Sequence, residues 1–386
     1  MENNSVLEPL HSEKELQQQW LEKLFLKKLG SLVTVLSWHC VTPSDREGFL
    51  SDIAFVKVRY TSQDIKETES QLVFKFLPQD DVKKQFVLDG GLAEREAEFY
   101  KITRNPVCRE ICHKSGIVLP VPECYFAGYT EDCITIVMQD LNTENYKTLI
   151  VKEGSTVAQT KTALRAIAVI HAIGYLYLAQ YKGAGNLGTI AQPVSSDILD
   201  QLFIPNLQTL AKMYEGTPTA DTIKMLIPFT TSLHNYPLKY PLFNTFLHGD
   251  YWAGQLLFSD DETKAIIIDW QFFYIGNPVC DIMAMFFMSS DINVLENHLE
   301  EVMNDYWSTF TKVIKANGTE INITFDQLMT NVEDLWVSGF IILVASIHDF
   351  IPAGNLTDER LRAAIKFLEN RGMFTKLIDE LSCHKL

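Results

Sequence analysis

The chain has 386 residues, enough for one large domain or for two smaller lobes that each bury a core. Hydrophobic residues make up 47% and charged residues 21%, a composition typical of globular proteins and not of disordered ones. The formal net charge of −16 argues against nucleic acid as a partner, because binding a phosphate backbone needs clustered Lys and Arg.

The sequence also indicates a compartment. Residues 1–19 are polar and have no apolar core, so we expect no signal peptide. The most apolar stretch, Phe340–Ile347, covers about two helical turns, whereas a membrane span needs roughly 20 residues. The seven cysteines are an odd, scattered set, which favours reduced thiols. We therefore expect a cytoplasmic protein with no membrane span; whether it has protein partners cannot be read from the sequence.

The first 140 residues are predicted to be rich in strands. Apolar residues recur at helical spacing in Glu13–Lys28, so residues 1–30 are interpreted as a helical N-terminal extension. Residues 31–140 are interpreted as an N-lobe with one helix, Leu92–Thr103. Its predicted strands are Leu32–Ser37, Ile53–Tyr60, Gln71–Leu77, Glu123–Tyr129 and Cys133–Gln139.

Residues 141–386 are predicted to form a mainly helical C-lobe. Helical spacing appears in Val157–Leu178, Ile198–Glu215 and Thr222–Asn235, and helices resume after a short island, Phe246–Ile275. A strand-rich lobe followed by a helical lobe is an α+β arrangement, and the cleft between such lobes is the expected ligand site.

The island holds residues that suit phosphoryl transfer. His248-Gly-Asp250 is followed by Gln255, an apolar run, a polar turn and a second run that ends at Asp269. Phosphoryl transfer needs one carboxylate to orient the acceptor hydroxyl and accept its proton. It also needs a carboxylate and a carboxamide to hold Mg²⁺. Asp250, Asp269 and Gln255 supply these groups, and His248 would hold the shape of the loop.

Each of these residues has a simpler reading when taken alone. Asp250 could stabilise a turn, Asp269 could cap a strand end, and Lys75 could face solvent from an alternating strand. Glu98 competes with Glu96 as the ion-pair partner of Lys75, although Glu96 fits the spacing to Phe99 and Tyr100 better. The joint order of these residues favours a functional site. Trp252 and Trp270 suit either an acceptor pocket or core packing, and His171 suits a structural role.

The island resembles the catalytic and metal motifs of the aminoglycoside and choline kinase group, and within it the ecdysteroid kinase-like (CHK kinase-like) family. The resemblance runs from about Leu32 to Phe286. It implies that Gly48 and Ser51 belong to a nucleotide-facing hairpin, and that Lys75, paired with Glu96, reaches the α and β phosphates. It also implies a hinge for adenine that includes Gln139 and Leu141, and an aspartate, Asp281, that braces the catalytic loop.

The resemblance implies a bilobal protein-kinase-like fold in which ATP binds between a β-rich N-lobe and a mainly helical C-lobe. Asp250 would act as the base, Asp269 and Gln255 would hold Mg²⁺, and the acceptor would be a small, sterol-like alcohol. Protein substrates are not expected, because the chain lacks the long activation loop and the Ala-Pro-Glu signature.

One residue departs from the family pattern. The family has Asn at the end of the catalytic loop, where this chain has Gln255, and Mg²⁺ is strict about ligand distances. Two rival readings stay open, besides that of a scaffold with no nucleotide site. One is a pseudokinase that binds nucleotide or a hydrophobic ligand without turnover; the other is a choline-type or aminoglycoside-type kinase with a cationic acceptor.

Overall fold

The computed structural model describes residues 7–43, 50–63, 66–180 and 188–383. The chain divides into two compact units. The sheet unit comprises Met1–Asn105, Val121–Tyr146 and Asp269–Gln271, and the helical unit comprises Pro106–Pro120, Lys147–Ile268 and Phe272–Leu386. A short segment of the island, Asp269–Gln271, thus belongs to the sheet unit although its neighbours in sequence do not.

The sheet unit is built on one antiparallel sheet of five strands in the order β1-β2-β3-β5-β4. Strand β3 is central, and its Lys75 lies between Ile53 of β2 and Ile136 of β5. The alternating apolar residues of each strand explain one buried face. The strands are β1 (Val33–Val41), β2 (Asp52–Ser62), β3 (Thr68–Phe76), β4 (Cys124–Tyr129) and β5 (Ile134–Gln139).

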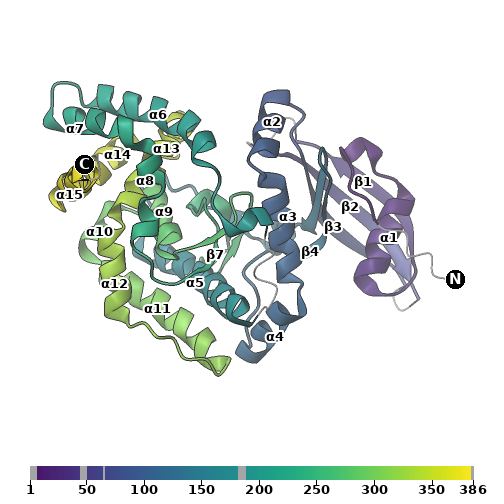
Figure 1. Ribbon diagram of the computed structural model, residues 1–386. Helices are drawn as coiled ribbons and strands as arrows, with labels where there is room; N and C mark the ends of the chain where they lie inside the picture. The colour runs from purple at the N-terminus through teal and green to yellow at the C-terminus, as the bar shows by residue number, and fades with distance from the viewer. Residues whose placement is uncertain (1–6, 44–49, 64–65, 181–187, 384–386) are drawn as a thin grey trace. The chain divides into compact units, whose positions relative to one another are not determined.

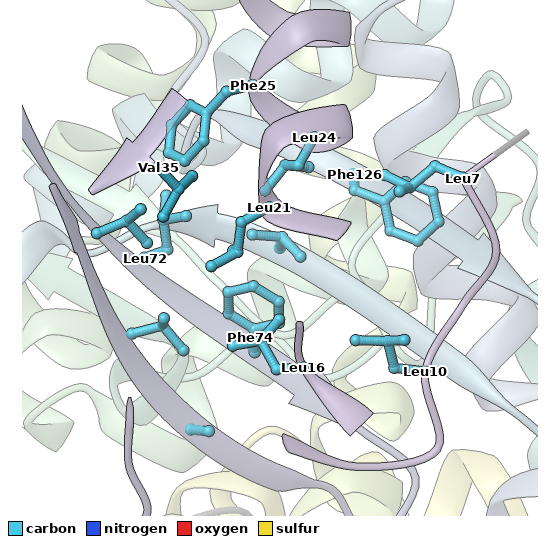
Figure 2. Close-up of a cluster of buried hydrophobic side chains, with 14 of the residues drawn as sticks. Leu7, Leu10, Leu16, Leu21, Leu24, Phe25, Val35, Leu72, Phe74 and Phe126 are labelled. Carbon is cyan, nitrogen blue, oxygen red and sulfur yellow. The ribbon is translucent and has the colours of Figure 1, made fainter. Parts of the chain in front are cut away.

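Helix α1 (Gln18–Leu29) packs on one face of this sheet, as Figure 2 shows. Its buried Leu21, Leu24 and Phe25 join a cluster that includes Phe74 of β3. The helix is shorter than the predicted Glu13–Lys28. The chain makes one 3-10 turn, η1 (Glu13–Glu15), and then runs extended, which sends Leu16 into the same cluster.

Two helices follow β3. Helix α3 (Leu92–Thr103) has the predicted bounds and starts after Gly91, whose φ of 61° suits glycine. Helix α2 (Asp81–Asp89) was not predicted; the Asp80 carboxylate caps it by accepting the Lys83 amide hydrogen at 2.9 Å. The sheet unit ends with the 3-10 turn η2 (Leu141–Glu144).

The helical unit is arranged around α5 (Val157–Gln180), which lies beside α11 in Figure 1. Apolar side chains on most of its surface explain its buried position. The other helices are α4 (Pro106–Ser115), α6 (Ser196–Met213), α7 (Pro218–Leu226), α8 (Thr230–His234), α9 (Val279–Ser289), α10 (Ile292–Asn297), α11 (Leu299–Ala316), α12 (Phe325–Asp334), α13 (Trp336–Phe350), α14 (Asp358–Asn370) and α15 (Met373–Cys383).

The structure of this unit differs from the prediction in two places. Helix α4 was not predicted; it belongs here, and Asn317 at the end of α11 donates to its Ile111 carbonyl and Ser115 hydroxyl. The predicted helix Thr222–Asn235 is interrupted at Pro228, which cannot donate a helical hydrogen bond, so α7 and α8 are separated by the turn η5 (Ile227–Phe229). The remaining 3-10 turns are η4 (Gly188–Ala191), η6 (Tyr236–Lys239) and η7 (Ala253–Gln255).

Two small antiparallel sheets carry the island. Strand β7 (Thr245–Leu247) pairs with β10 (Tyr274–Gly276). Strand β8 (Leu256–Phe258) pairs with β6 (Lys147–Thr148) and β9 (Ala265–Ile267). The segment after β7 carries His248, Asp250 and Gln255, and the loop after β9 carries Asp269.

By length and composition alone, α5 could cross a membrane, and 72% of its apolar window is buried inside the structure. Helices α12 and α13 pass the same test when taken together, with a bend of 48° between them.

Candidate active site

In the sheet unit, the candidate site is centred on Lys75. Its ammonium nitrogen lies 2.6 Å from Glu96 Oε2 and also contacts Asp269 Oδ1. Lys75 is only 6% exposed and Glu96 is fully buried, while the Asp269 side chain keeps a third of its surface exposed. Glu98, the rival partner, pairs instead with Lys101 at 2.6 Å.

The three charges shift one another's protonation. Burial by itself lowers the pKa of Lys75, but the charges of Asp269 and Glu96 outweigh it and raise this pKa. Burial raises the pKa of Glu96 to about 7 against the opposing charge of Lys75. Lys75 is therefore a cation at neutral pH, held on a central strand by Asp269 and Glu96.

Asp269 has an unusual backbone. Its φ is 63°, a left-handed conformation that non-glycine residues seldom adopt outside turns and functional sites. The next residue, Trp270, is fully buried and stacks on Phe99 of α3 with ring centroids 3.6 Å apart. Glu96 and Phe99 lie three residues apart on one face of α3. The same helix face thus holds both Lys75 and the segment that carries Asp269.

In the helical unit, the loop after β7 carries His248, Gly249 and Asp250. Gly249 has a φ of 81°, and a Cβ at this position would lie 2.4 Å from the Phe272 carbonyl oxygen. Only glycine fits this turn without strain.

His248 links the two loops of the island. Its Nε2 lies 2.8 Å from the Ile268 carbonyl oxygen, and its Nδ1 lies 3.2 Å from the Asp250 amide nitrogen. A carbonyl accepts and an amide N–H donates, so one neutral tautomer, protonated at Nε2, satisfies both contacts. The predicted role of His248 in holding the loop shape agrees with this geometry.

Asp281 on α9 also holds this loop, through hydrogen bonds with the loop backbone. Its carboxylate accepts the His248 amide hydrogen at 2.7 Å and the Gly249 amide hydrogen at 3.0 Å, and it is 1% exposed. Charged acceptors make stronger hydrogen bonds than neutral ones, especially when buried. The backbone ahead of Asp250 is therefore fixed.

Gln255 contacts Asp250 directly. Its amide nitrogen Nε2 donates to Asp250 Oδ2 at 2.9 Å. Its backbone is tied to the island as well, because the Ile268 amide hydrogen is donated to the Gln255 carbonyl at 2.9 Å. The carboxamide therefore orients the proposed base, a contact that the sequence did not reveal.

The oxygen atoms needed for Mg²⁺ are of the right kind. Asp269 offers a carboxylate that is 33% exposed, and Gln255 keeps a carboxamide oxygen while its nitrogen faces Asp250. Carboxylate and amide oxygens are ligands that Mg²⁺ prefers. Each of the two residues therefore carries an oxygen of the kind that Mg²⁺ prefers, and their role as metal ligands stays a prediction.

The predicted nucleotide contacts lie in the sheet unit, with one exception. Ser51 is buried just before β2, Gln139 ends β5 with its amide on Glu144, and Leu141 opens η2. Gly48 lies outside the described residues. Ser289 was missed: its hydroxyl accepts the Ala253 amide hydrogen at 2.7 Å. No local pattern marks a contact between residues 36 positions apart.

A sheet unit with a buried Lys–Glu pair and a helical unit with a braced His-Gly-Asp loop define a protein-kinase-like protein, which confirms the predicted fold class. The chain matches the ecdysteroid kinase-like family over residues 45–319 and belongs to that family, as its motifs predicted.

Solved structures with similarity to this chain include three small-molecule kinases. Choline kinase from Cryptosporidium parvum Iowa II is 13% identical, with 93% of each chain covered and a TM-score of 0.45. Ethanolamine kinase from Plasmodium vivax is 12% identical, with 85% of this chain and 82% of that chain covered and a TM-score of 0.42. A variant of aminoglycoside 2′-phosphotransferase-IIIa, in complex with GDP, is 12% identical, with 92% and 98% covered and a TM-score of 0.43. No curated protein matches the chain.

Proposed function

We propose that this protein transfers the γ-phosphoryl group of ATP to a hydroxyl group of a small, sterol-like alcohol. Membership of the ecdysteroid kinase-like family supports this proposal. The observation that carries it is the buried Lys75–Glu96 pair with Asp269 on the same ammonium group. Stability alone does not explain a buried lysine beside two acidic side chains, since burying each charge costs several kcal/mol.

In this proposal, bound ATP supplies the phosphoryl group and Mg²⁺ neutralises its charge. Lys75 contacts the α and β phosphates, and Glu96 keeps its ammonium group in place. Asp269 and the Gln255 carboxamide oxygen hold the metal. Ser51, Gln139 and Leu141 contribute to nucleotide binding, together with Gly48.

Asp250 acts on the acceptor. Its carboxylate orients the alcohol hydroxyl and accepts the proton that leaves as the oxygen bonds to the γ-phosphorus, while the bond from that phosphorus to the bridging oxygen breaks and ADP leaves. Gln255 holds the Asp250 carboxylate by one hydrogen bond, and His248 holds its backbone by another. Both contacts reduce the freedom of the base before the acceptor arrives.

The test is a panel of small alcohols that includes sterols, choline and aminoglycosides, with transfer of the γ-phosphoryl group measured on purified protein. Asp250→Asn should slow transfer by about a hundredfold or more while ATP binding, measured by calorimetry, is kept. The matched control is Asp260→Asn, because Asp260 is 64% exposed in the turn after β8 and pairs only loosely with Lys147. Unchanged transfer in Asp250→Asn would refute the proposed base.

A second candidate function rests on Gln255. Because glutamine replaces the family's asparagine and donates to Asp250, the chain is also suited to be a pseudokinase that binds nucleotide without turnover. Magnesium-dependent ATP binding with no transfer to any alcohol of the panel would favour that function. Transfer to a quaternary amine or aminoglycoside, and not to a sterol, would instead identify a cationic acceptor.

A further inference from the structure

A series of buried hydrogen bonds connects three helices of the helical unit. His171 of α5, Asp281 of α9 and Tyr306 of α11 are 0%, 1% and 0% exposed. His171 Nδ1 lies 2.9 Å from the Tyr306 hydroxyl oxygen, and His171 Nε2 lies 3.2 Å from Asp281 Oδ2. Because Asp281 also accepts the amide hydrogens of His248 and Gly249, this series of hydrogen bonds reaches the loop that carries Asp250.

Hydrogen-bond chemistry assigns a direction to each contact. An ionised carboxylate only accepts, so His171 must carry its proton on Nε2 in order to donate to Asp281. Burial lowers the pKa of His171, which favours the neutral imidazole and leaves Nδ1 as an acceptor. Tyr306 then donates its hydroxyl hydrogen to Nδ1.

The Asp281 carboxylate therefore selects the imidazole tautomer, and the Tyr306 hydroxyl holds the ring in place. If Nδ1 carried the proton, Nε2 would turn a lone pair toward the Asp281 carboxylate, a repulsive contact in a buried place. The hydrogen bond from Tyr306 to Nδ1 orients the ring so that Nε2–H faces Asp281, as outer partners orient histidines at metal sites. His171 is tied to β7 as well, because Thr245 donates its hydroxyl hydrogen to the His171 carbonyl.

We infer that Tyr306 is a positioning residue for the catalytic loop, acting through the orientation of the His171 ring and of Asp281. This inference rests on the proposed function, since it assigns a role in placing the base Asp250. It concerns a residue that lies 135 positions from His171 in sequence and outside every motif of the island.

The first test is Tyr306→Phe, which keeps the aromatic ring stacked against Phe310 and removes only the hydroxyl. We expect the turnover number for phosphoryl transfer to fall about tenfold while the KM for ATP stays nearly unchanged. The matched control is Tyr236→Phe, because Tyr236 is also buried and its hydroxyl contacts Tyr240 and Glu380. The control should lose a similar hydrogen bond without a change in turnover.

The second test needs no substrate. Long-range ¹H–¹⁵N spectra of protein labelled at histidine distinguish the two tautomers, and His171→Gln assigns the signal. We expect the Nε2-protonated form in the wild type and in Tyr306→Phe, with the ¹⁵N signal of Nδ1 shifted in the variant because Nδ1 no longer accepts a hydrogen bond. Faster hydrogen exchange of the His248 and Gly249 amides should accompany that shift.

An Nδ1-protonated His171 in the wild type would overturn the inference, as would unchanged amide exchange or unchanged turnover in Tyr306→Phe. If no alcohol is phosphorylated, the proposed function fails while the tautomer and the amide exchange still decide the inference. The two failures are therefore separable.

Discussion

At the scale of single residues, Asp269 combines a strained backbone with a partly exposed carboxylate. Its left-handed backbone, with φ at 63°, costs roughly 1–2 kcal/mol for a residue with a Cβ, and asparagine or aspartate meets that cost more readily than most. The ion pair with Lys75 and the buried ring of Trp270 hold it in place. A carboxylate kept in such a conformation, and still one third exposed, suits a ligand that binds from outside.

Gln255 is the residue that separates the proposed kinase from the alternative pseudokinase, because the family has asparagine at this position. Gln255→Asn restores the residue type of the family and shortens the side chain by one methylene group. We expect phosphoryl transfer in this variant to be kept or raised, because the shorter carboxamide suits the strict ligand distances of Mg²⁺. The measurement is the initial rate with the best alcohol of the panel at several Mg²⁺ concentrations.

The opposite result for Gln255→Asn would also be informative. The Nε2–Asp250 hydrogen bond at 2.9 Å depends on the length of the glutamine side chain. A fall of transfer to background would therefore mean that the glutamine is built into the site as a holder of the base. Gln255→Leu, which removes both the nitrogen and the oxygen, is the reference for complete loss.

At the scale of secondary structure elements, α1 is part of the sheet unit's core. Leu24 on its inner face is fully buried and joins the cluster in Figure 2, whereas Leu26 on the same helix is 39% exposed. We expect Leu24→Ala to lower the free energy of unfolding by about 2–5 kcal/mol, through lost burial and a cavity. Leu26→Ala should change it by less than about 1 kcal/mol.

Denaturant unfolding followed by circular dichroism measures both variants. Equal stability of Leu24→Ala and Leu26→Ala would contradict the packing of α1 on the sheet. ATP binding is a second readout, because β1 and β2 lie under this helix and β2 starts next to Ser51.

Periodicity in the sequence predicted the elements with strong apolar patterns. The five strands and α3 fall where alternation or helical spacing placed them, because burial on one face imposes those periods. Helices α2 and α4 escaped because they are short and mostly polar, with one and two buried residues. For α2 the Asp80 cap after Pro78 was an available signal.

The residues of the candidate site that belong to sequence motifs could be predicted. The order of Lys75, Glu96, Asp250 and Asp269 indicated which residues act together, and the structure places Lys75 against Glu96 and Asp269. The contacts of Tyr306, Ser289 and Phe99 could not be predicted, because each joins helices or loops that are distant in sequence. Tertiary packing, with no sequence period of its own, decides such contacts.

At the scale of the whole molecule, the family match covers residues 45–319, and the chain continues beyond both ends of it. The flanking parts are built into the units. Helix α1 lies in the core of the sheet unit, and α13 approaches α9 so closely that a Cβ at Gly339 would lie 2.1 Å from the Phe287 ring. Removing these flanks should therefore damage the folded units that carry the site.

Acid stability is the property of the helical unit that follows from its series of buried hydrogen bonds. Burial lowers the pKa of His171 below its ordinary value of 6.5, so the unfolded chain takes up a proton there that the folded protein does not. Above pH 6.5, His171 therefore does not reduce the free energy of unfolding. Below that value the free energy of unfolding falls with pH, because the unfolded state binds more protons than the folded state.

His171→Gln removes this titration. Its free energy of unfolding, measured with denaturant between neutral and mildly acidic pH, should depend on pH less steeply than that of the wild type. One proton contributes at most about 1.4 kcal/mol per pH unit, so the slopes should differ by no more than that. His39→Gln, at an exposed position of β1, is the control and should keep the wild-type slope. Equal slopes for His171→Gln and the wild type would mean that the imidazole binds its proton equally well in the folded and unfolded states, so that burial does not oppose its charge. That result would remove one support for the neutral imidazole that the positioning role of Tyr306 requires.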